Sequence, residues 1–368
     1  MDYRDVINNT RELLLKHKPD WEALWAGYAD EISENLPFIQ AMRRQLYQWK
    51  PLYLYLTKTE AGKASNNVTF QLRYLGHRVA KLTIGKQITL STSGFEQTNK
   101  DDFGCEISLE NSDWNGPEAR EFRRHFRDKH KDDKSKKRQE SRIESLLLTE
   151  FYKKQTSEKA LRGIQSVRIA GLRFPMPTPL SASKHGEIGY SGSGGGGIDI
   201  LARVGTGGKR HLCIIELKDE YKKSKPPSHA IEQAIKYTVF IRELLRSKSG
   251  ATWWKLFGYN GPIPKSLELF AACAVPYIPD ADTSFAGDKY GISDDNVHDF
   301  IILHHIYFKD LGDRIEIPDT SLGNPNYLFG TNYPTEEYVQ MVKQIRASDP
   351  EPFRILKPAP EDSSGSDT

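Results

Sequence analysis

The stretch GGIDILARVGTGGKRHLCIIELKDE, residues 196–220, decides the expected fold of this chain. Two apolar runs flank Gly207-Gly208, and a Gly-Gly pair supplies the positive φ angles that a two-residue hairpin turn requires. A turn centred on these glycines pairs residues whose numbers sum to 415, and 199 and 216 are such a pair. Asp199 is therefore expected opposite Glu216 on one face of the hairpin. Lys218 follows two residues later, so the alternation of side chains places it on that same face.

Two carboxylates and an ammonium at one end of a hairpin allow two interpretations. In the first, Lys218 forms an ordinary surface ion pair with Asp199 or Glu216. In the second, a cation lies between the two carboxylates, which otherwise repel each other, and their oxygen ligands suit Mg²⁺ or Mn²⁺. A neighbouring lysine can then hold a water and offset the charge that develops on a phosphate. The hairpin register and the glycine run before Asp199 favour the second interpretation.

The order of these residues resembles that of the PD-(D/E)XK nuclease superfamily. Its signature is an acidic residue at the start of one strand, here Asp199, and then (D/E)-x-K in the next strand, here Glu216-Leu217-Lys218. Ile198 stands where the family usually has proline. A predicted long helix, residues 228–247, then carries Gln233 and Tyr237 four residues apart on one helical face. This pair resembles the Q-x-x-x-Y motif of the RecB-like and λ-exonuclease-like branch.

The resemblance implies a role for each of these residues. It implies that Asp199, Glu216 and the backbone carbonyl of Leu217 bind Mg²⁺, for which Mn²⁺ substitutes. It implies that Lys218 orients or activates the attacking water. It also implies that Gln233 positions the water or metal-bound groups and that Tyr237 supports the DNA phosphate.

The superfamily also tends to carry a glutamate on the preceding helix. RIESLLLTEFYKK, residues 142–154, contains two candidates, Glu144 and Glu150. Apolar residues follow Glu144 at three, four and seven positions, and apolar residues precede Glu150 at similar spacings. Glu144 is preferred as a further catalytic residue and metal ligand, and Glu150 stays open as the alternative.

The resemblance implies that the chain is a metal-dependent deoxyribonuclease and that its partner is DNA. A nuclease preceded by an unrelated N-terminal region is similar to bacterial restriction and anti-phage defence effectors. Two other hypotheses stay open: a catalytically silent nucleic-acid-binding subunit, and a nuclease that cuts only with a partner protein in a larger defence or repair complex. The choices between endonuclease and exonuclease and between DNA and RNA also stay open.

The rest of the chain predicts an α/β protein in several parts. Residues 1–50 have helical periodicity with breaks at Pro19 and Pro37, and residues 51–134 form a β-rich domain with hairpins between 68 and 90. Residues 135–350 alternate helices and strands, which predicts an α/β/α layer sandwich around a small mixed β-sheet. Residues 351–368 have the composition of a disordered tail.

Partner surfaces are expected mainly in the N-terminal half. Trp21, Trp25 and Trp49 form either an exposed interface, for a homo-oligomer, a partner protein or a signal, or part of the core. Residues 120–138 hold ten Lys or Arg against four Asp or Glu, which predicts either a solvated helix end and linker or a basic arm that contacts phosphates. The net charge of +3 does not decide between them.

Cysteine content and hydropathy indicate the cellular compartment in which the protein is expected. The three cysteines lie far apart and form no C-x-x-C pair, which argues against a disulfide framework or a zinc site and favours a reducing cytoplasm. The sequence contains no run of 18 apolar residues and no N-terminal signal pattern, so we expect a cytoplasmic protein without a membrane span.

Overall fold

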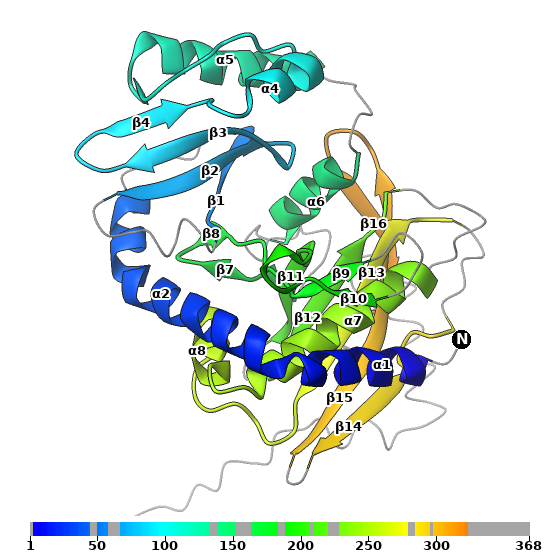
Figure 1. The fold of residues 1–368 in the computed structure, drawn as a ribbon. Coiled ribbons are helices and arrows are strands. Elements are labelled where there is room, and N and C mark those ends of the chain that lie inside the picture. Colours follow the sequence, from blue (N-terminus) through cyan, green and yellow to red (C-terminus); the bar gives the residue numbers. More distant parts are fainter. Residues whose placement is uncertain are drawn as a thin grey trace, which may run out of the picture.

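The computed structural model describes residues 3–44, 50–57, 67–132, 139–151, 163–182, 188–206, 209–219, 228–278, 284–294 and 297–322. Within these residues it contains two seven-stranded sheets, a two-stranded hairpin of β9 (Leu180–Ala182) and β10 (Ile188–Tyr190), and helices packed on both sheets (Figure 1). The chain is therefore a mixed α/β protein, as its sequence predicts. The glycine turn at 207–208 and the C-terminal tail lie outside the described residues.

The first sheet has the order β5-β4-β3-β2-β1-β8-β7. Helices α4 (Glu96–Phe103) and α5 (Pro117–Asp132) cover one side of it (Figure 1). The hairpins expected between residues 68 and 90 are confirmed. Strands β7 and β8 follow helix α6 (Gln139–Glu150) in the chain, yet β8 pairs in parallel with β1 through Arg173 and Tyr55. The strands are β1 (Leu52–Tyr55), β2 (Val68–Tyr74), β3 (His77–Ile84), β4 (Ile88–Ser91), β5 (Ser112–Asp113), β7 (Arg168–Ile169) and β8 (Leu172–Arg173).

The second sheet has the order β14-β15-β13-β12-β11-β6, with β16 beside β15. Strand β13 is parallel to both β12 and β15, and the other pairs are antiparallel. The strands are β6 (Ile164–Ser166), β11 (Ile200–Thr206), β12 (Lys209–Leu217), β13 (Glu268–Pro276), β14 (Lys289–Asp294), β15 (Val297–Asp310) and β16 (Ile315–Thr320).

Alternate residues of β12 belong to two different cores. Leu212 and Ile214 lie in one core together with apolar residues of helix α7 (Ser228–Leu245), such as Ile235. Cys213 and Ile215 lie in the other, together with apolar residues of α6. Because strand side chains alternate between faces, one face of the sheet packs against α7 and the other against α6. Glu216 shares the face of Ile214, which faces α7.

The N-terminal helices α1 (Tyr3–Lys16) and α2 (Lys18–Arg44) pack against α7 and against α8 (Gly250–Leu256). Trp21 and Trp25 are completely buried and meet the ring of Phe240 edge-on. The indole of Trp253 donates a hydrogen bond of 3.1 Å to the backbone carbonyl of Trp25. Of the two alternatives for Trp21 and Trp25, a place in the core is confirmed and an exposed interface is wrong, because α7 and α8 cover them. Trp49 lies outside the described residues.

A partly buried set of charges joins α1, α7, β14 and β15. Asp299, with 1% of its surface exposed, accepts hydrogen bonds of 2.8 Å from Arg242 Nε and 3.0 Å from Arg246 Nε. Arg242 also pairs with Glu243 at 2.7 Å and with Asp294 at 2.7 Å. We call this set the arginine–carboxylate network; its members are Arg11, Arg242, Arg246, Glu243, Asp294 and Asp299.

Two further expectations bear on the chain's environment. Cys105, Cys213 and Cys273 are free thiols, each buried. Among the helices that the structure describes, none has both the length and the apolar character that crossing a membrane requires.

Candidate metal centre

The β11–β12 hairpin brings Asp199 and Glu216 together in the register that the sequence predicts. All seven cross-strand pairs, from Ile200↔Ile215 to Thr206↔Lys209, have residue numbers that sum to 415. Asp199 is the residue just before β11, so one further step of this register places it beside Glu216. The backbone N–H of Leu217 donates a hydrogen bond of 2.8 Å to Asp199 Oδ2, which fixes that carboxylate at the end of β12.

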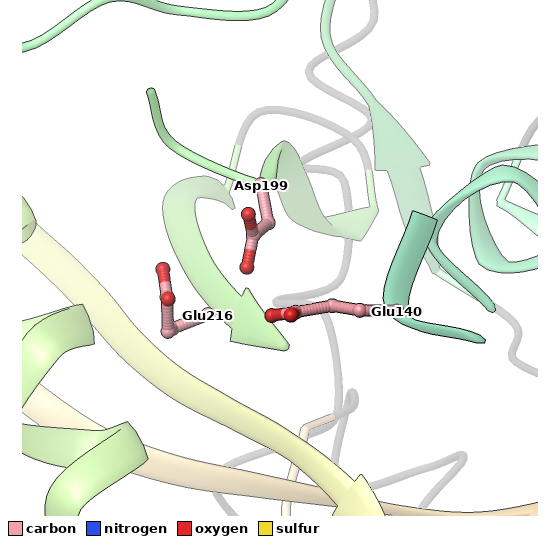
Figure 2. A group of neighbouring side chains, drawn as sticks. All are labelled: Glu140, Asp199 and Glu216. Carbon is pink, nitrogen blue, oxygen red and sulfur yellow. The ribbon is translucent and has the colours of Figure 1, made fainter. Parts of the chain in front are cut away.

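A third carboxylate, that of Glu140, reaches the same point from the first turn of α6. Figure 2 shows the side chains of Glu140, Asp199 and Glu216 converging from three separate segments. One carboxylate oxygen from each lies within 4.8 Å of the others. The three side chains differ in solvent exposure: that of Glu216 is 2% exposed, and that of Glu140 is 45% exposed. The site is thus open on the α6 side and closed at Glu216.

Lys218 is the only cation that pairs with these three carboxylates among the described residues. Its Nζ lies 2.7 Å from Glu216 Oε1 and 3.4 Å from Glu140 Oε1. The other oxygen of Glu216, Oε2, is buried and has no hydrogen-bond donor within the described parts of the chain. A buried carboxylate oxygen without a donor is costly. The cluster therefore holds more negative charge than its one ammonium neutralises.

Burial and the neighbouring negative charges together raise the pKa values of the buried carboxylates in this cluster. Burial raises the pKa of Asp199 to about 6, although the hydrogen bond from Leu217 and the charge of Lys218 oppose the rise. Burial and then the charge of Asp199 raise the pKa of Glu216 well above its usual range. The pKa of Lys218 is raised because the attraction of Glu216 outweighs the cost of burial. A cation placed between the carboxylates would reverse the first two shifts.

Glu144, the predicted helix glutamate, lies one helical turn after Glu140 and is not a member of the three-carboxylate group. Burial and then the charge of Asp199 raise the pKa of Glu144 to about 8, against the opposing charges of Arg73 and Arg173. The charge of Asp199 therefore acts on Glu144, and the role of Glu144 as a ligand stays a prediction. Glu150 is buried at the other end of α6 and is likewise outside the group.

Gln233 and Tyr237 lie on α7, the helix that packs on the Glu216 face of the sheet. Gln233 Nε2 donates a hydrogen bond of 3.3 Å to the hydroxyl of Tyr237. Burial and then the charge of Glu216 raise the pKa of Tyr237 to about 12. A Cβ on Gly196 would come within 2.9 Å of the Tyr237 hydroxyl, so the glycine run before Asp199 lets the backbone approach this ring. The Q-x-x-x-Y pair thus borders the carboxylate cluster.

Glu140 is the residue that the sequence reasoning missed. Glu140 and Glu144 are four apart and share one helical face, so the spacing could not choose between them. An acidic residue in the first turn of a helix is a signal that could have drawn attention to Glu140.

Comparisons with family models, with curated proteins and with solved structures found no match to this chain. Any function assigned to it therefore rests on the geometry of its own residues.

Proposed function

We propose that this chain is a metal-dependent nuclease that hydrolyses phosphodiester bonds in DNA, with its active centre at Glu140, Asp199, Glu216 and Lys218. The observation that carries the proposal is the buried excess of carboxylates over cations at the end of the β11–β12 hairpin. The arrangement of cores on both faces of the second sheet supports the α/β/α layer sandwich that the superfamily would have. A role in bacterial defence stays a prediction from the architecture alone.

The donor set fits Mg²⁺ or Mn²⁺. All three side chains offer carboxylate oxygen atoms as ligands. Glu216 Oε2 has no hydrogen-bond partner among the described residues, so it would be available to bind an ion. Asp199, Glu216 and Glu140 would hold the ion, with the carbonyl of Leu217 as the predicted backbone ligand. When bound, the ion would supply positive charge against the negative charge of the phosphate.

The chain's own residues account for the remaining chemistry. An ammonium only donates hydrogen bonds, so Lys218 would hold a water or a phosphate oxygen beside the carboxylates. The side chain of Lys218 is 31% exposed, which leaves it within reach of a substrate. The Tyr237 hydroxyl oxygen accepts the hydrogen bond from Gln233, so its O–H would still be able to donate a hydrogen bond to a phosphate oxygen.

Cleavage of supercoiled plasmid and linear duplex tests the proposal, with Mg²⁺, Mn²⁺ or EDTA, for wild type, Lys218→Ala and the control Lys86→Ala. Lys86 is an exposed lysine outside the cluster. We expect cutting that requires the metal and falls by about 100-fold or more in Lys218→Ala, the usual loss when one transition-state donor is removed. Lys86→Ala should cut like wild type. Equal cutting by Lys218→Ala and wild type would refute the assignment.

Calorimetric titration with Mn²⁺ resolves the case in which nothing is cut. Binding by wild type and its loss in Glu216→Gln would indicate a nuclease that needs a partner. No binding by wild type would show that the cluster is not a metal centre. Nicked circles among the products would mark an endonuclease.

A further inference from the structure

Helix α5 carries a second charged feature, of the opposite sign to the carboxylate cluster. Four arginines at spacings of three, one and three residues lie on one face of this helix. They line a hollow of about 210 Å³ together with Lys50, which precedes β1, and Leu52, the buried first residue of β1. We call it the arginine hollow; its lining residues are Lys50, Leu52, Arg120, Arg123, Arg124 and Arg127.

The charges of the arginine hollow are poorly neutralised. Arg127 pairs with Asp128 at 3.0 Å, in an exposed ion pair. Within the described residues, the side chains of Arg120, Arg124 and Lys50 make no ion pair and no hydrogen bond. Five cations around one small space repel each other, Asp113 and Asp128 offset only part of that repulsion, and a bound anion would offset more of it.

Arg123 forms the buried base of the hollow. It is 7% exposed, its guanidinium lies 4.0 Å above the ring of Trp114, and it donates a hydrogen bond to the Trp114 carbonyl. Burial and then the charge of Arg120 lower the pKa of Arg123. The protein therefore holds one guanidinium rigidly at the bottom and presents Arg120, Arg124 and Arg127 around it.

The chemistry of these residues selects a phosphate. Planar guanidinium groups donate two parallel hydrogen bonds to phosphate oxygens, and clusters of arginine are used for that purpose. The hollow is smaller than the roughly 300–1,000 Å³ of a site that encloses a whole small molecule. It suits one or two phosphate groups of a larger ligand. The basic composition also continues along the chain to residue 138, far beyond what a single phosphate needs.

We propose that the arginine hollow binds the phosphate backbone of a nucleic acid, at a place separate from the carboxylate cluster. The inference requires that the chain binds nucleic acid and does not require that it cuts it. It names a second point of contact for the substrate of the proposed function, carried by the part of the chain that the nuclease resemblance does not cover.

Fluorescence anisotropy with a labelled DNA duplex in EDTA, at several salt concentrations, tests this inference on the full chain. The test variant is Arg120→Gln with Arg124→Gln, because both side chains are exposed and glutamine has a similar helix propensity. The control is Arg78→Gln with Lys86→Gln, which removes two exposed charges that do not line the hollow.

We expect the test variant to bind DNA at least about tenfold more weakly. The slope of log affinity against log salt concentration should be shallower by about 1.8, because each of the two lost phosphate contacts contributes about 0.9 to it. The control should keep the wild-type slope. A wild-type slope in the test variant, or an equal loss in the control, would overturn the inference.

Two further measurements complete the test. Binding of inorganic pyrophosphate that is lost in the test variant, while DNA binding persists, would assign the hollow to small phosphorylated molecules and refute a nucleic-acid backbone. Mn²⁺ titration of the test variant should match that of wild type, because the substitutions leave the carboxylate cluster unchanged. A chain that binds DNA through the hollow but neither cuts it nor binds Mn²⁺ would refute the proposed function and leave this inference standing.

Discussion

The molecule contains two partly buried clusters built from the same kinds of charged residue, and they differ in the balance of positive and negative charge. In the arginine–carboxylate network, three arginines meet three carboxylates, and Asp299 accepts hydrogen bonds from two arginines and from the backbone N–H of Leu267. At the end of the β11–β12 hairpin, three carboxylates meet one ammonium. The charges of the arginine–carboxylate network are therefore balanced within the described residues, and those of the carboxylate cluster are not.

The pKa values follow that difference. The pKa of Asp294 in the arginine–carboxylate network is lowered, because the hydrogen bonds and charges of Arg242 and Arg11 outweigh burial. The pKa of Asp199 is raised because burial and the charge of Glu140 outweigh Lys218 and the hydrogen bonds to Asp199. The pKa of Glu216 is raised because burial and the charge of Asp199 outweigh Lys218. The partners of a buried charge therefore distinguish the two clusters: the balanced set joins elements of the fold, and the unbalanced set is the candidate ligand site.

Asp299→Asn should have the largest effect of the variants that probe this comparison. It leaves Arg242 and Arg246 facing a neutral amide in a site with 1% exposure, and breaking a buried ion pair in this way costs about 3–5 kcal/mol. Urea unfolding measures the loss. The control is Asp294→Asn, whose side chain is 42% exposed and should cost clearly less. Equal stability of Asp299→Asn and wild type would break the comparison.

Glu144→Gln should change how stability depends on pH when no metal is present. The pKa of Glu144 is about 8 in the folded chain and 4.5 in its ordinary state, so the folded protein retains a proton that the unfolded chain releases. The stability of wild type therefore falls as pH rises from 5 to 9, and glutamine cannot ionise. Relative to Glu144→Gln, wild type should lose up to about 4 kcal/mol across that range in EDTA. Parallel curves for the two proteins would contradict the raised pKa.

Glu216→Gln should have the smallest effect and the opposite sign to Asp299→Asn. Both replace a carboxylate that is almost fully buried by its own amide. At pH 8 in EDTA we expect Glu216→Gln to gain about 1 kcal/mol in unfolding free energy, because it removes repulsion with Asp199 that Lys218 does not offset. Saturating Mn²⁺ should reverse the order by stabilising wild type alone. A loss of stability in EDTA would place Glu216 among the structural charges.

The hairpin and its register could be predicted because they depend on local rules. A turn and the alternation of side chains fix which residues of β11 and β12 face each other, and Asp199, Glu216 and Lys218 follow from them. The N-terminal helices and the β2–β4 hairpins follow from periodicity in the same way. Pro19 marks the boundary between α1 and α2, since it is the second residue of α2, where no backbone N–H is needed.

The features that the sequence could not predict depend on contacts between distant segments. Glu140 joins Asp199 only because α6 meets the end of β12, and the helical face alone did not show which of its glutamates would arrive there. The sequence left open whether Trp21 and Trp25 lie in the core or at an interface, and it did not show that α7 and α8 would cover them. Pro37 was expected to end a helix, but α2 continues through it to Arg44, so that expectation is wrong. The loss of one hydrogen bond does not end a helix of 27 residues.

The pairing of β8 with β1 has a consequence for the order in which the chain can fold as a ribosome synthesises it. Tyr55 and Arg173, which hydrogen-bond at 2.8 Å, are 118 residues apart. The first sheet cannot be completed until the segment after α6 has emerged, although five of its strands are made long before. The N-terminal helices wait longer still, because Trp25 meets Trp253 across 228 residues. The nascent N-terminal half therefore exposes apolar surface for much of its synthesis, the state in which chains depend most on chaperones.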